Sequence, residues 1–137
     1  MNSNIKLLLA AIIGFAFFYG LFFFWAYFAN WNPFFKYLIS CCASEPWFKS
    51  ALFIQDLLIN SLLCLIPAYL ILKLNHKNLF LILCFAVIPS FILNNYHLLL
   101  SDFWGAQYFM FLSGWFVELM LLPLIAVVLS MVKINGT

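Results

Sequence analysis

The sequence has few charged residues and no arginine. Charged side chains make up 7% of the 137 residues, against about 25% in soluble globular proteins. The formal net charge is only +2, and the lysines form no basic run. Phosphate-binding surfaces need clustered positive charge, so we expect no nucleic-acid partner.

The chain also lacks the motifs of common enzymes and metal sites. It contains no glycine-rich phosphate loop, no nucleophile elbow and neither C-x-x-C nor H-x-x-x-H spacing. We therefore expect no catalytic residue, no metal and no cofactor, and an ordinary enzyme is not expected.

Two of the four cysteines, Cys41 and Cys42, are neighbours in a predicted outer loop. Quinone-coupled disulfide-forming enzymes use C-x-x-C in such a loop, so thiol redox catalysis is not expected here. Adjacent cysteines seldom pair with each other. We expect this pair to anchor the loop as apolar side chains or to bridge to another chain.

Hydrophobic residues are correspondingly abundant, at 68% of the chain, with a mean hydropathy of +1.12. A membrane-spanning helix needs roughly 20 apolar residues. We predict an all-α, polytopic membrane protein: a single transmembrane helical bundle over residues 1–137, with a short interfacial helix in the first outer loop. Four transmembrane helices are predicted near residues 7–28, 51–72, 79–99 and 108–132.

Short local signals refine this prediction. Asn32 followed by Pro33 resembles a helix N-cap with proline at the first helical position, so the interfacial helix should begin there. The first span also carries two pairs of small residues one turn apart, which let a neighbouring helix come close. These pairs are Ala10 with Gly14 and Ala16 with Gly20.

The lysines predict the orientation in the membrane. Lys6, Lys73, Lys77 and Lys133 would lie on one side, and Lys36 and Lys49 on the other. Positively charged loops stay in the cytoplasm. We therefore expect a multi-pass protein of the bacterial inner (plasma) membrane with both termini cytoplasmic.

Polar residues inside the predicted spans gather in the outer half of the bilayer. Intramembrane ionisable residues usually mark functional sites. The functional interpretation is a vestibule open to the outside that binds a cation, a polar head group or a partner's helix. The candidate binding residues are Glu118, Asp56, Asn60, Asn94 and His97.

The alternative interpretation is structural. Asn60, Asn94 and Asn95 would then hydrogen-bond helix to helix and fix the register of the bundle. Glu118 has no cationic partner at its depth, so we expect it to be neutral and bonded to Asn60 or Asn94. Pro123 follows one turn later and leaves the Leu119 carbonyl without its helical donor.

These features lead to two expectations about function. The first is a small integral membrane protein that acts as a subunit or interaction module of an oligomeric assembly. Its partners would be the lipid bilayer and further copies of itself or other membrane subunits. The alternative is a small proton- or cation-coupled transporter or flippase that depends on Glu118.

Overall fold

A computed structural model describes residues 2–75, 77–99 and 115–135 of the chain. These residues are almost entirely helical, and no strand occurs among them. The helices are α1 (Ser3–Trp31), α2 (Pro33–Cys42), α3 (Phe48–Lys73), α4 (Leu79–Leu99), the π-helical turn η1 (Val117–Leu121) and α6 (Leu122–Asn135).

Three helices of the described part are long and apolar enough to cross a membrane. They are the Ser3–Phe28 part of α1, the whole of α3, and the Leu79–Tyr96 part of α4. The apolar stretch Glu118–Val132 is shorter, and the first part of the predicted fourth span, 108–114, lies outside the described residues. The all-helical, membrane-compatible class predicted from the sequence is thus confirmed.

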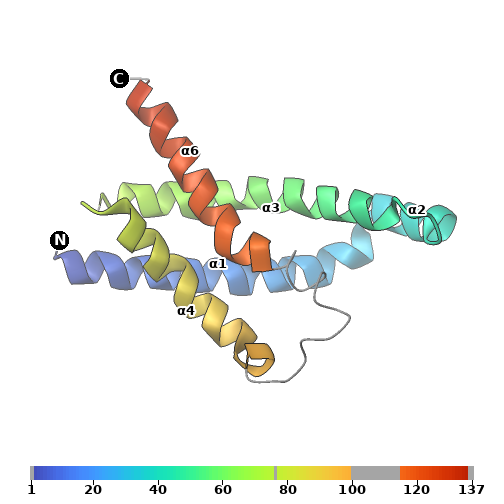
Figure 1. Cartoon of the computed structure of the whole chain (residues 1–137), viewed down its shortest axis with the longest axis horizontal. Helices are drawn as coiled ribbons and strands as arrows, with labels where there is room; N and C mark the ends of the chain where they lie inside the picture. The colour runs from blue at the N-terminus through green and yellow to red at the C-terminus, as the bar shows by residue number, and fades with distance from the viewer. Residues whose placement is uncertain (1, 76, 100–114, 136–137) are drawn as a thin grey trace.

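The long helices α1 and α3 run side by side in opposite directions (Figure 1). Helix α4 crosses α1 and then slopes away from it, while α6 crosses α3. The chain termini and the α3–α4 turn lie toward one end of the molecule, and α2 lies at the other (Figure 1). The Lys6 Nζ donates a hydrogen bond of 2.8 Å to the Asn75 carbonyl oxygen, which ties the start of α1 to the α3–α4 turn.

Asparagine side chains cap two of the helices. The Asn32 Oδ1 accepts a hydrogen bond of 3.0 Å from the Phe34 N–H, so α2 begins with the predicted cap and Pro33. The Asn78 Oδ1 accepts one of 3.1 Å from the Leu81 N–H at the start of α4. Each cap satisfies a backbone donor that has no partner within its helix.

Helices α1 and α4 cross in close contact at Gly14. Its neighbour one turn back, Ala10, is fully buried, as is Ala86 on α4. A Cβ added to Gly14 would overlap the Ala86 carbonyl oxygen and lie 3.0 Å from the Ala86 Cα. Only glycine allows this approach, so the first small-residue pair has a packing role.

A second contact face runs along α3. Its buried residues fall on one stripe, because spacings of three and four residues return to the same side of a helix. The segment of η1 and α6 packs against α3, and its buried residues are Leu121 on η1 and Leu122 and Ala126 on α6. The buried residues of α3 are Asn60, Cys64, Pro67, Ala68 and Ile71.

Candidate functional site: a polar groove beside Glu118

Glu118 lies in a π-helical turn rather than in a regular α-helix. The turn comprises Val117–Leu121 and comes just before Pro123. Proline has no N–H to donate to the Leu119 carbonyl and its ring crowds the preceding turn, so regular helical bonding cannot pass through this point. Such π turns widen the helix locally and often occur at functional sites.

The carboxylate of Glu118 is held by Asn95 of α4. The Asn95 Nδ2 donates to the Glu118 Oε2 at 2.7 Å and to the Phe91 carbonyl oxygen at 3.0 Å. The Trp115 Nε1 donates to the Asn95 Oδ1, also at 3.0 Å. A single amide thus joins α4 to both the indole and the carboxylate on the segment before α6.

The predicted partners of Glu118 were therefore wrong. We expected a bond to Asn60 or Asn94, and the structure gives Asn95. The reason is the crossing of α4 over α1. Asn94 follows Ala86 by eight residues and so lies on the same side of α4, the side that meets Gly14 of α1. Beyond this crossing α4 slopes away from α1 (Figure 1), and the Asn94 side chain is exposed. Asn95, about 100° further round the helix, is only 6% exposed and meets the segment that carries Glu118.

Asn60 bonds to a different helix. The Trp25 Nε1 of α1 donates to the Asn60 Oδ1 of α3 at 2.9 Å, and Asn60 is only 6% exposed. For Asn60 and Asn95 the structural interpretation therefore holds, because each joins two segments by a hydrogen bond between side chains.

An open groove lies between α1 and the polar residues of the neighbouring segments. Its volume is about 630 Å³. Asn94 and Glu118 line it together with aromatic side chains of α1. These aromatic residues are Phe18, Tyr19, Phe22 and Trp25. We call this space the polar groove.

The polar groove brings together only part of the predicted site. Glu118 and Asn94 line it, and Asn60 is linked to it through Trp25. Asp56 is half-buried on α3 and does not line it. His97 belongs to α4, but its side chain lies outside the described part of the structure.

The sequence did not reveal the aromatic wall of the groove. The first span is rich in aromatic residues throughout, and nothing in their spacing separates the groove-lining residues from those that face lipid. A tryptophan such as Trp25 near the end of an apolar helix is typical of the membrane interface. Its indole instead combines a hydrogen bond to Asn60 with a place on the groove wall.

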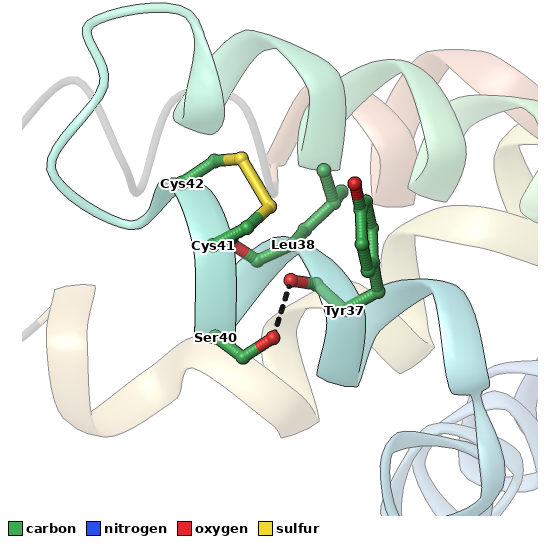
Figure 2. The surroundings of a disulfide bond; sticks show 5 residues. All are labelled: Tyr37, Leu38, Ser40, Cys41 and Cys42. Atoms are coloured by element: carbon green, nitrogen blue, oxygen red, sulfur yellow. Dashed lines mark hydrogen bonds between the residues drawn. A yellow bond between two sulfur atoms is a disulfide. The ribbon is translucent and has the colours of Figure 1, made fainter.

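Cys41 and Cys42 form a disulfide with each other at the end of α2 (Figure 2). This outcome differs from the expected anchoring or bridge to another chain. Nearby, the Ser40 Oγ donates to the Tyr37 carbonyl oxygen at 2.8 Å, and Leu38 is buried at 3% exposure. Among the described cysteines, Cys64 is a free thiol buried in the core, as expected for a small apolar residue.

Chemically, the polar groove offers one carboxyl group, one exposed amide and several aromatic rings. A carboxylate attracts cations, an amide donates and accepts hydrogen bonds, and aromatic rings present apolar surface with a negative face. Among the described residues, no group of three or more histidine, cysteine or acidic side chains could hold a metal ion. The groove therefore has the composition of a binding site.

Comparisons with known proteins add no relative. No protein-family model matches the chain, and neither a curated protein nor a solved structure is significantly similar to it. The class defined by the fold is a helical protein whose long apolar helices can span a membrane.

Proposed function

We propose that this protein is a small integral membrane subunit that assembles with further copies of itself. Gly20 on α1 carries the proposal. It is exposed, as is Ala16 one turn before it, and a Cβ added to Gly20 would meet no atom within 4 Å. The equivalent pair on the same helix, Ala10 and Gly14, is buried, and Gly14 packs against Ala86 of α4.

The surroundings of Gly20 suit a helix from a second copy. Ala16 and Gly20 line an apolar groove of about 450 Å³ between α1 and α3, with Pro67 on its other side. Helices in membranes associate where small residues let backbones approach closely. Most homo-oligomers are two-fold dimers in which the same patch of each copy meets its counterpart, and a single patch of small residues is enough for such a contact.

The test is the mass of the protein in nanodiscs or a mild detergent, measured by light scattering. Gly20→Ile places bulk in the apolar groove from a position where an added Cβ meets no atom within 4 Å, so it should convert the oligomer to a monomer that keeps its helical content. Val128→Phe adds bulk at another exposed position, on α6, and should leave the oligomer intact.

Three results would contradict this proposal. The first is a purely monomeric unaltered protein. The second is an oligomer that survives Gly20→Ile. The third is a different membrane protein that co-purifies with the chain in fixed stoichiometry and is released by Gly20→Ile, which would give the contact face to that partner.

We further infer four spans, near residues 7–28, 51–72, 79–99 and 108–132, in a bacterial inner membrane. Both termini would be cytoplasmic, and α2 would lie in the outer interface. The distribution of lysines supports this orientation. The amphipathic composition of α2, with Lys36 among aromatic and aliphatic residues, supports an interfacial position.

A second candidate function is a proton- or cation-coupled transporter or flippase that depends on Glu118. One observation favours it: Glu118 lines an open groove instead of being enclosed in the core. Glu118→Gln keeps an oxygen that can accept the Asn95 hydrogen bond but cannot ionise. It should preserve assembly and abolish coupled transport. Transport that continues in this variant would exclude the second candidate.

A further inference from the structure

We infer that the polar groove binds a lipophilic organic cation between Glu118 and the aromatic side chains of α1. This inference rests on the groove of the second candidate function, but it requires binding only and not transport. The ligand would carry a positive charge on an apolar body, because the groove is lined by a carboxyl group and aromatic rings.

The distribution of charge favours a cationic ligand. All six lysines lie outside the four predicted spans, and Lys6, at the start of α1, donates a hydrogen bond to the Asn75 carbonyl oxygen. An ionised carboxylate among apolar helices is stabilised by a positive partner. Among the described residues no lysine lies within these spans, and a ligand with a positive charge would supply such a partner.

The aromatic lining of the groove also favours a cation. Phe18, Phe22 and Trp25 of α1 line the groove together with Tyr19. An aromatic face attracts a cation placed within about 6 Å of the ring centre, and recognition of organic ammonium groups commonly uses several such rings. A small hydrated metal ion would gain little from these rings. An anion would be repelled by an ionised Glu118 and by the negative faces of the rings.

The size and polarity of the groove suit a small organic molecule. The polar groove has a volume of about 630 Å³, within the range of roughly 300–1,000 Å³ found for small-molecule sites. Its lining is mostly apolar with a few polar atoms, from Asn94 and Glu118 in particular. This balance fits an apolar ligand body that carries one charge.

The Glu118 carboxylate is held in position and is still accessible from the groove. The Asn95 amide holds the Glu118 Oε2 at 2.7 Å, and Trp115 fixes that amide in turn. Glu118 nevertheless lines the open groove. A bound cation would therefore meet a carboxylate already held in one orientation, so little conformational entropy would be lost on binding.

The experiment measures binding of tetraphenylphosphonium to the full-length protein in dodecyl maltoside by calorimetry. Triphenylphosphine oxide serves as an uncharged ligand of related shape. We expect the unaltered protein to bind the cation and to bind the neutral compound at least about tenfold more weakly. Absence of cation binding up to about 1 mM, the limit of a weak complex, would overturn the inference, as would equal binding of the two compounds.

Two carboxylate variants provide the matched comparison. Glu118→Gln should weaken binding of tetraphenylphosphonium at least about tenfold. Asp56→Asn removes a carboxylate on α3 that does not line the groove, and should leave binding unchanged. Equal losses in the two variants, or no loss in Glu118→Gln, would overturn the inference, because attraction would then come from overall charge or from apolar surface alone.

A third variant tests the aromatic wall. Phe22→Leu keeps apolar surface but removes a ring, and should weaken cation binding by roughly 2- to 5-fold without affecting the neutral compound. Equal weakening for both compounds would contradict a role for the ring face.

The cation could be a free molecule or the ammonium head group of a lipid. Competition by short-chain phosphatidylcholine, and not by phosphatidylglycerol, would support the cation site and identify a lipid as its source. Light scattering on the same samples separates this inference from the proposed assembly. A protein that forms the oligomer but does not bind the cation would overturn only the inferred site. A monomer that still binds the cation would overturn only the proposed assembly.

Discussion

Replacing Asn95 by leucine should destabilise the protein much more than the same replacement of its neighbour Asn94. The two residues are adjacent on α4, and leucine has nearly the shape of asparagine. Asn95 is only 6% exposed and bonded to Glu118 and Trp115, whereas the Asn94 side chain is exposed. The pair of variants therefore isolates the hydrogen bonds from any effect of helix propensity or hydrophobicity.

The magnitude follows from the bonds that are lost. Asn95→Leu removes the bond to the Glu118 Oε2 at 2.7 Å and the bond from the Trp115 Nε1 at 3.0 Å. Side-chain hydrogen bonds between membrane helices contribute about 0.6–2 kcal/mol each. Two such bonds predict a loss of roughly 1–4 kcal/mol in the free energy of unfolding. Asn94→Leu should change it by less than about 0.5 kcal/mol.

The assay is equilibrium unfolding by sodium dodecyl sulfate in mixed micelles, followed by circular dichroism so that the signal does not depend on Trp115. Adding Trp115→Phe to Asn95→Leu should cost less than the sum of the separate effects, because both changes remove the same bond. Equal stability of Asn94→Leu and Asn95→Leu, or full additivity with Trp115→Phe, would refute the reasoning.

Three other predictions concern separate parts of the chain. Gly14→Ala should destabilise the protein by about 1–3 kcal/mol in the same assay, because the new Cβ overlaps the Ala86 carbonyl oxygen and two helices must separate; unchanged stability would contradict the close crossing. Cys41→Ser combined with Cys42→Ser should leave helical content and oligomer mass intact, since the bond joins neighbours and closes no long loop; a dimer of the unaltered protein that disappears on reduction would show a bridge between chains instead. A reporter fused after Thr137 should be active only if it is of the cytoplasmic type, and activity of an outer-compartment reporter there would overturn the orientation.

The helices were predictable because their signals are local. Asn32 and Pro33 mark the start of α2 as a cap and a first helical residue, and the apolar run 79–99 coincides with helix α4, Leu79–Leu99. Long apolar runs bounded by polar turns determine helix positions whatever the helices pack against.

The partners of the polar residues were not predictable in the same way. Asn94 and Asn95 are identical neighbours, and the choice between them depends on where α4 leaves α1 and on the π turn that carries Glu118. Both are consequences of tertiary packing: the crossing depends on Gly14 meeting Ala86, and the turn lies just before Pro123. The sequence contained each of these residues but not the angle between the helices that they produce.

The pairing of α1 with α4 affects how the chain is made. A ribosome adds about 5–20 residues per second, so α1 enters the bilayer several seconds before α4 has been synthesised. During that interval the Gly14 surface faces lipid or other proteins, because its partner Ala86 does not yet exist. Helix α3 likewise precedes its main neighbour α6. Both main contacts of this small protein are therefore completed only late in translation, and until then the contacts between α1 and α3, such as the hydrogen bond from Trp25 to Asn60, are the ones that can form.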